Sequence, residues 1–327
     1  MSRVSWIFIA VLAGLAAAAL HASMVTVSPL SVILFYLAPL PLFITGLSYG
    51  WVPAALAAAA GTLATAALAG LRPALFFLAM SAAAPVVLSR LALINRPAVQ
   101  AAGEGEAKDG GIEWYPEGRL VLWVAFFAGI LLTLMVIVAG PDAESFRATL
   151  KQISETITAP IVKDMTPEQV QGLRELVDVL VFVAPLASAA MWLLATLVNL
   201  VLASRLLRRW GTSLRPWAPF SSLAFPPRSG LALVATTAGS FLPGTLGLVS
   251  SVFAAPLAAA FMVLGLSVVH HLVRRSTARV LLLVGLYAGL FLLSWLLVVP
   301  LIVLGLAELL FGIRARADRH AIAKPNT

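Results

Sequence analysis

The residues best suited to chemistry are a few polar groups inside long apolar stretches. Glu308 is the only charged residue between Val280 and Ile313. An ionisable group in an apolar membrane stretch is costly and marks a functional site by default. Two roles are open for Glu308, pairing with an arginine such as Arg314 or handling a proton or ligand, and pairing is the preferred interpretation. Asn199, in a similar position near the end of another apolar stretch, is interpreted as an interhelical hydrogen-bonding residue rather than a ligand contact.

His270 and His271 form the second group of candidates. Adjacent residues on a helix point about 100° apart, so the two imidazoles cannot both reach one metal ion from a single face. The chain has no cysteine, and no metal site or cofactor is expected. The preferred interpretation places both histidines at a helix end, where a positive charge complements the helix dipole. Contact with a ligand or partner is the alternative.

Helix breakers at two places form the third group. Gly and Pro inside an apolar segment either kink a membrane helix or unwind it, and an unwound turn exposes carbonyls to a bound molecule. A kink is favoured for the first set, while the second set is open because three breakers fall within five residues. The sets are Pro39, Pro41 and Gly46, and then Pro243, Gly244 and Gly247.

Composition decides the class of protein. Hydrophobic residues make up 61% of the 327 residues and charged residues 11%, whereas soluble domains carry about 25% charged residues. The sequence therefore predicts a multi-pass membrane protein. The net charge of +8 reflects basic residues at the ends of apolar segments, so topology explains it better than nucleic acid does. No P-loop, HExxH or GxSxG motif is present, and we expect no enzyme and no pump that hydrolyses ATP by itself.

Segments of about 20 apolar residues are long enough to cross the hydrocarbon core. The fold class expected is all-α, a polytopic transmembrane bundle of about eight to ten helices. The first segment is interpreted as an uncleaved membrane helix in preference to a signal peptide. The segment from Trp51 to Gly70 is rich in small residues and is expected to be buried between its neighbours. The expected spans lie within 1–23, 29–50, 51–70, 72–90, 120–139, 167–204, 231–250, 252–272 and one or two in 280–313.

Polar regions suggest the domain boundaries. Residues 95–118 read as a flexible cytoplasmic loop between a four-helix unit, 1–94, and a C-terminal unit, 119–313. Within 141–176, the spacing of Phe146, Leu150, Ile153 and Ile157 predicts an amphipathic helix on the membrane surface. Thr166, Pro167 and Gln169 then predict a capped helix start. A basic tail, 314–327, closes the chain.

The last apolar stretch and the charges together predict the orientation. As one helix, 34 residues would be about 51 Å long, so the stretch either bends at Pro300 into a hairpin or projects beyond the membrane as one helix. The distribution of basic residues favours the hairpin. With the N-terminus in the cytoplasm, 17 of the 22 basic residues then lie inside. The positive-inside rule therefore favours an even number of crossings, about ten, with the C-terminus also cytoplasmic.

Several stretches resemble a known family. They are PLPLFITGLSYGWVPAALAAAAGTLATAALAGLRPALFFLAMSAAAPVVL, VAPLASAAMWLLATLVNLVLASRLLRRWG, LGLSVVHHLVRR and LGLAELLFGIR. These resemble the YybS-like predicted membrane proteins of domain-of-unknown-function family 2232, with Glu308 where the family pattern has an aspartate. That family is distantly similar to the S components of energy-coupling-factor transporters, which bind a small molecule and dock through an AxxxA patch. Ala13 and Ala17 have that spacing.

Two functions remain open. The first is a small-molecule-binding subunit of a transporter in the bacterial inner membrane, similar to an S component, which works with an ATPase and coupling complex. The second is a non-catalytic envelope scaffold, in which the amphipathic segment and an arginine-rich loop recruit envelope proteins or anionic lipid. The partners expected are therefore the lipid bilayer, an unknown small molecule and one of these protein classes, with no nucleic acid.

Overall fold

The chain is almost entirely helical and divides into two compact units. The computed structural model describes residues 3–26, 28–97, 111–140, 142–162 and 165–323. Unit 1 comprises residues 1–124 and 194–219, and unit 2 comprises residues 125–193 and 220–327. The division differs from the boundaries expected at 94 and 119, because it runs through two long helices, α7 (Glu117–Ala139) and α9 (Pro167–Arg209).

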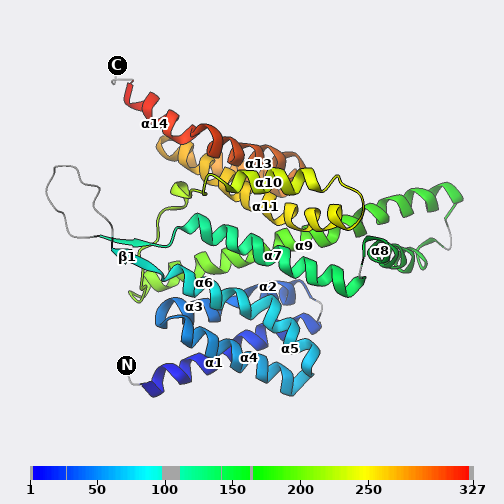
Figure 1. Cartoon of the computed structure of the whole chain (residues 1–327), viewed down its shortest axis with the longest axis horizontal. Helices are drawn as coiled ribbons and strands as arrows, with labels where there is room; N and C mark the ends of the chain where they lie inside the picture. Colours follow the sequence, from blue (N-terminus) through cyan, green and yellow to red (C-terminus); the bar gives the residue numbers. More distant parts are fainter. Residues whose placement is uncertain (1–2, 27, 98–110, 141, 163–164, 324–327) are drawn as a thin grey trace. The chain divides into compact units, whose positions relative to one another are not determined.

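Unit 1 contains the N-terminal helices (Figure 1). A helix interrupted at Ala38 forms the second candidate span, and a π-helical segment interrupts the fourth. The elements are α1 (Arg3–Ala22), η1 (Ser23–Thr26), α2 (Pro29–Leu37), α3 (Pro39–Tyr49), α4 (Trp51–Ala69), α5 (Leu71–Phe77), η2 (Leu78–Ala82), α6 (Ala83–Ala92), β1 (Asn95–Pro97) and β2 (Ile112–Trp114).

Small residues determine the packing of α1 against α4. A Cβ added at Gly14 would lie 2.1 Å from the carbonyl oxygen of Ala57, so only glycine permits this approach. Close approach of backbones stabilises helix pairs where lipid supplies no hydrophobic driving force. The expectation that 51–70 is buried holds for the first half of α4, whereas Leu63 and Leu68 in the second half are exposed.

Unit 2 contains the amphipathic segment and the C-terminal helices. Its most extensive packing joins α11 to α13. Besides the parts of α7 and α9, its elements are α8 (Ala143–Thr158), η4 (Phe220–Ser222), α10 (Ser229–Gly239), α11 (Gly244–Leu272), η5 (Val273–Arg275), α12 (Arg279–Leu292), α13 (Ser294–Phe311) and α14 (Ile313–Ala323).

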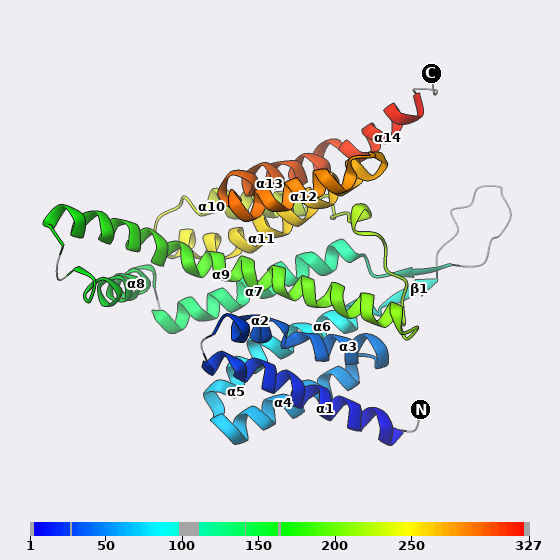
Figure 2. The ribbon, with the colours of Figure 1, turned by 180° about the vertical axis from the view of Figure 1, so that it is seen from behind.

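Two helix boundaries in unit 2 differ from the expected ones. The break expected near Ser250 lies at 240–243, and α11 continues through Ser250 and Pro256 as one helix. The apolar stretch 280–313 forms two helices, but they meet at Leu293 instead of Pro300, which lies inside α13. Helices α12 and α13 lie side by side (Figure 2). Proline at 300 is tolerated because it removes only one helical hydrogen bond, which neighbouring groups in a bundle can replace.

The polar regions 95–118 and 141–176 contain regular structure at their edges. β1 and β2 pair as a short antiparallel ladder, with Arg96 opposite Glu113. Most of the predicted flexible loop, 98–110, lies outside the described residues. The expected capping box is present at the start of α9, where the Thr166 N–H donates to Gln169 Oε1 at 3.0 Å.

The amphipathic helix α8 packs on unit 2 through Phe146 and two polar side chains. Phe146 is buried, but Ile153 and Ile157 are 43% and 45% exposed. Ser154 and Thr158 are buried instead, and the Ser154 hydroxyl donates to Asp178 Oδ1 of α9. Polar pairing with α9 therefore helps to orient α8, the isoleucines remain outward, and the expected contact of α8 with the membrane surface stays a prediction.

Seven helical segments in the described residues are long and apolar enough to cross a membrane, or eight if α13 and α14, bent by 69°, count as one. Helices α10 and α12 are apolar but shorter. Large side chains such as Phe8, Leu68 and Phe291 are exposed in these helices, as lipid-facing residues would be. The structure confirms an all-α polytopic membrane fold.

Candidate functional site

The break between α10 and α11 is shaped by the three predicted helix breakers. Pro243 precedes the first turn of α11 with an extended backbone. Gly244 has a φ of 71°, a left-handed conformation that favours glycine. A Cβ at Gly247 would lie 1.8 Å from the Leu242 carbonyl oxygen, so glycine allows the connecting segment to fold against the helix. The breakers therefore form a tight turn between two helices.

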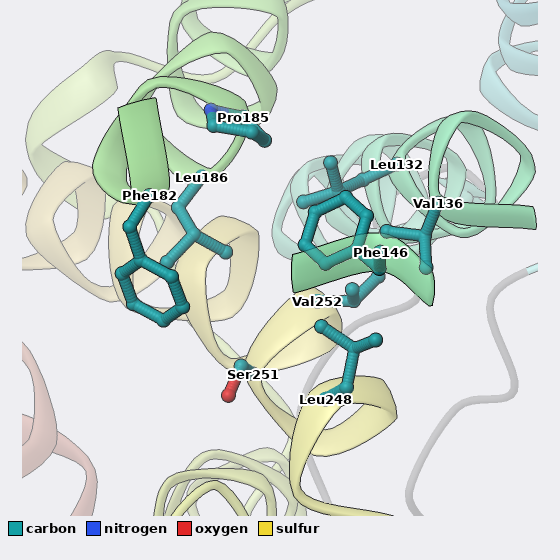
Figure 3. A pocket seen from close by; sticks show the side chains of 9 residues that line it. All are labelled: Leu132, Val136, Phe146, Phe182, Pro185, Leu186, Leu248, Ser251 and Val252. Atoms are coloured by element: carbon teal, nitrogen blue, oxygen red, sulfur yellow. The ribbon is translucent and has the colours of Figure 1, made fainter. Parts of the chain in front are cut away.

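An apolar hollow in unit 2 lies next to this turn. Figure 3 shows Phe182 of α9 on one side and Leu132 and Val136 of α7 on the other. The empty space between its lining residues is about 280 Å³ when open solvent is included, and Ser251 supplies the one polar side chain of its lining. The complete lining is Leu132, Val136, Phe146, Phe182, Pro185, Leu186, Leu248, Ser251 and Val252.

A second hollow adjoins the first and reaches the turn itself. The two share Phe146, Phe182, Leu248 and Ser251. The empty space of the second is about 400 Å³ when open solvent is included, and its other lining residues are Ala143, Arg147, Ser240, Leu242, Gly244 and Gly247. Arg147 is the only charged residue of either lining. The pair of hollows therefore combines an apolar floor with one cation.

The two histidines contact different partners within unit 2. His270 Nε2 lies 2.9 Å from the Tyr287 hydroxyl of α12, and its ring meets Phe220 edge-on. His271 Nδ1 accepts from Arg274 Nη1 at 2.8 Å, which places the imidazole proton on Nε2, 3.2 Å from Asp318 Oδ2. His271 thus belongs to a cluster with Arg274 and Asp318, and the hollows lie elsewhere on α11.

Glu308 forms an ion pair at the bend between α13 and α14. Its carboxylate accepts from the Arg314 backbone N–H at 3.0 Å and from Arg314 Nε at 2.9 Å. Arg314 also donates to the carbonyls of Ser221 and Leu223. Both carboxylate oxygens of Glu308 are therefore engaged in holding this bend.

The remaining candidates lie in unit 1. Asn199 is 1% exposed, and its amide donates to the carbonyls of Tyr36 and Ala195, both at 2.7 Å. This contact supports the chain beside the interruption at Ala38. Of the first set of breakers, Pro41 accepts a hydrogen bond from the Thr45 hydroxyl, while Pro39 and Gly46 are buried in α3. A ligand role for Pro39, Pro41 and Gly46 stays a prediction.

The family comparison covers almost the whole of both units. A family model described as "Predicted membrane protein (DUF2232)" matches residues 15–309. The chain belongs to the DUF2232 family. No curated protein and no solved structure matches the chain. Membership agrees with the polytopic helical fold, and the AxxxA residues Ala13 and Ala17 of this DUF2232 protein face the apolar core that α1 forms with α4.

Sequence reasoning missed an arginine cluster in this DUF2232 protein. Arg215 is 6% exposed and donates to the carbonyls of Ala92 and Tyr115 at 2.8 and 3.2 Å. Its guanidinium pairs with Glu117 at 3.3 Å and lies 4.4 Å from the ring centroid of Trp217. Burial lowers the pKa of Arg215 below its ordinary value, although the Glu117 carboxylate opposes the shift. Arg215 therefore fixes the loop after α9 to the start of α7.

A second missed group is His21 in α1. The imidazole is 8% exposed, its Nδ1 lies 2.8 Å from the Ser81 hydroxyl, and the rings of Phe35, Phe76 and Phe77 surround it. Ser81 belongs to the π-helical turn η2. His21 and Ser81 lie 60 positions apart, and no spacing pattern in the sequence links them.

The described part of the chain contains no group of three or more His, Asp or Glu placed to hold a metal ion.

Among the residues that line the hollows, the sequence indicated Phe146 as part of the apolar face of α8 and Gly244 and Gly247 as helix breakers. It gave no signal for Arg147, Phe182 or Leu248, because those residues come together only when α8, α9 and α11 pack.

Proposed function

We propose that this DUF2232 protein is a membrane-embedded binding subunit that holds an apolar or amphiphilic small molecule in the two adjoining hollows of unit 2. The observation that carries the proposal is that both hollows share Phe146, Phe182, Leu248 and Ser251 at the turn between α10 and α11. Ligand sites are typically lined by hydrophobic and aromatic side chains with a few polar groups. The lining is mostly apolar, as in such sites.

The interrupted helices give further support. Irregular backbone at membrane depth is tolerated where protein or a cavity satisfies it, and transporters place such breaks at their binding sites. The turn at Pro243 and Gly244 is of this kind. In the proposed arrangement both termini are cytoplasmic, the protein lies in a bacterial inner membrane, and the hollows open toward the outer face.

Energy for transport would come from a separate complex of an ATPase and a coupling protein, in the manner of an S component. The role is non-catalytic. Tagged protein purified from its native membrane is then expected to bring an ATPase with it.

Photo-crosslinking tests the binding site directly. The full chain is placed in phosphatidylcholine nanodiscs with a diazirine-bearing hexadecanol, and labelled peptides are mapped by mass spectrometry. We expect labelling at Phe182 and Leu248, and a several-fold loss in Leu248→Trp, whose larger side chain fills the hollow. Leu246→Trp is the matched control because Leu246 is exposed on the same helix. Labelling that spreads evenly over exposed helices and ignores Leu248→Trp would overturn the proposal.

A scaffold role is the second candidate, and a different surface favours it. Arg205, Arg208 and Arg209 are exposed on the last turns of α9, next to exposed Trp210, and no ion pair is found for these arginines among the described residues. Basic clusters beside a membrane helix attract anionic lipid or acidic protein surfaces. In-cell crosslinking that recovers an envelope protein, with no ATPase and no labelling of the hollows, would favour this role.

A further inference from the structure

The mouth of the second hollow carries a charge that its lining does not neutralise. Arg147 is exposed on α8, and in the described parts of the chain it has no ion pair. No acidic residue lines either hollow. An arginine placed beside an apolar cavity without a counter-ion leaves its strongest interaction, a bidentate bond to a carboxylate or phosphate, unused.

The preceding residue connects this cation to the apolar floor. Phe146 is 4% exposed and lines both hollows, whereas Arg147 lines only the second. Neighbours on a helix point about 100° apart. One turn of α8 therefore supplies both an apolar wall and a cation at its edge, and the first hollow extends the apolar surface away from that cation.

The other polar side chains of the lining cannot replace Arg147 as donors. The Ser251 hydroxyl donates to the Gly247 carbonyl at 2.8 Å, and the Ser240 hydroxyl donates to the Thr237 carbonyl at 2.6 Å. Each hydroxyl has a single proton. While these bonds persist, the serines can only accept, so Arg147 is the one side-chain donor available to an anion.

We infer that the ligand of this site is an anionic amphiphile, with a hydrocarbon chain along Phe146, Phe182 and Leu248 and its carboxylate or phosphate on Arg147. The inference rests on the proposed function and adds the ligand class. A neutral ligand would gain only a weaker hydrogen bond from Arg147 than an anion does, and a cationic one would be repelled. The same headgroup chemistry can come from a free amphiphile or from a bilayer lipid.

The test compares two diazirine probes of equal chain length, hexadecanoic acid and hexadecanol, on the full chain in phosphatidylcholine nanodiscs. We expect the acid to label the Phe182 and Leu248 peptides at a concentration about tenfold lower than the alcohol does, the factor that one charged hydrogen bond supplies. Arg147→Gln should weaken labelling by the acid to the level of the alcohol in the same variant and so remove this difference. Lys151→Gln is the control, since Lys151 is exposed one turn further along α8 and lines neither hollow.

Competition identifies the source of the ligand. Suppression of labelling by phosphatidylglycerol in the nanodisc supports a bilayer headgroup, and suppression by added hexadecanoic acid alone supports a free amphiphile. Equal labelling by acid and alcohol, or an unchanged preference in Arg147→Gln, would overturn the anionic class while the proposed binding site stands. Failure of both probes to label the hollows would instead overturn the proposed function.

Discussion

The Glu308 carboxylate and the Arg314 guanidinium meet at 2.9 Å across the bend between α13 and α14. The two side chains are only 11% and 12% exposed. Arg314 also donates to the carbonyls of Ser221 and Leu223, so one ion pair ties the end of α13 to the loop before α10. A charged residue in an apolar stretch, which on sequence alone is a candidate for proton or ligand chemistry, here has a structural role.

Glu308→Gln is expected to destabilise the chain. It leaves the Arg314 charge without its counter-ion in a largely buried position, and loss of one partner of a buried pair costs about 3 kcal/mol. The unfolding midpoint in an SDS titration from neutral detergent should fall accordingly. Glu155→Gln, at an exposed position of α8, should leave the midpoint unchanged. A Glu308→Gln chain of normal stability that no longer binds or transports would assign Glu308 a functional role instead.

Arg215→Lys is expected to destabilise unit 1 by about 2–3 kcal/mol. A lysine ammonium cannot reach Ala92, Tyr115 and Glu117 with a planar fork, and it stacks less well on Trp217. The exposed Arg208 provides the matched control, Arg208→Lys. Thermal unfolding of both variants in the same detergent measures the effect, and equal midpoints for the two would show that the cluster contributes little.

The elements that the sequence predicts well are those determined by local chemistry. Thr166 and Gln169 cap α9 as their spacing indicates, and Pro243 and Gly244 interrupt the chain where three breakers fall together. The prediction of a turn at Pro300 was wrong, because the turn lies at Leu293. Neither glycine nor proline marks Leu293, and a proline within a packed membrane helix need not end it.

Contacts between residues that are distant in sequence are predicted less well. Arg215 and Glu117 are 98 positions apart, and their pairing depends on how α7 and the loop after α9 fold together. The histidine pair is a similar case. Adjacency argued against a shared metal, but the contacts of His271 with Asp318 and of His270 with Tyr287 depend on the packing of α11 against α14 and α12.

Gly14→Ala should disrupt the packing of α1 against α4. The added methyl group would lie 2.1 Å from the Ala57 carbonyl oxygen, which is backbone and cannot turn away. Overpacking of this kind costs about 1–3 kcal/mol. At Gly285 in α12 nothing lies within 4 Å of the added carbon, so Gly285→Ala should be neutral or stabilising by up to about 1 kcal/mol through helix propensity. Equal unfolding midpoints in SDS for Gly14→Ala and Gly285→Ala would contradict the claim that the packing of α1 against α4 requires glycine at position 14.

Asp142 should make the stability of α8 depend on pH. Its Oδ1 accepts from the Ser145 N–H at 2.8 Å and caps the helix. This hydrogen bond to the backbone holds the pKa of Asp142 below its ordinary value. A group with a lowered folded-state pKa contributes stability that is present above its ordinary pKa, near 3.9 for aspartate, and is lost as the pH falls through the lowered pKa.

Hydrogen–deuterium exchange of the α8 amides, compared between variants at one pH, measures this contribution. At pH 6 the wild type and Asp142→Asn should protect α8 equally, since both side chains are good N-caps, and Asp142→Ala should protect it less. Near pH 3 the α8 amides of the wild type should lose part of their extra protection relative to Asp142→Ala. The α8 amides of Asp142→Asn should keep their extra protection, because asparagine does not titrate. An unchanged wild-type advantage at low pH would show that the carboxylate charge does not stabilise this helix. Because α8 carries Phe146 and Arg147, any such loss would also loosen the wall of both hollows.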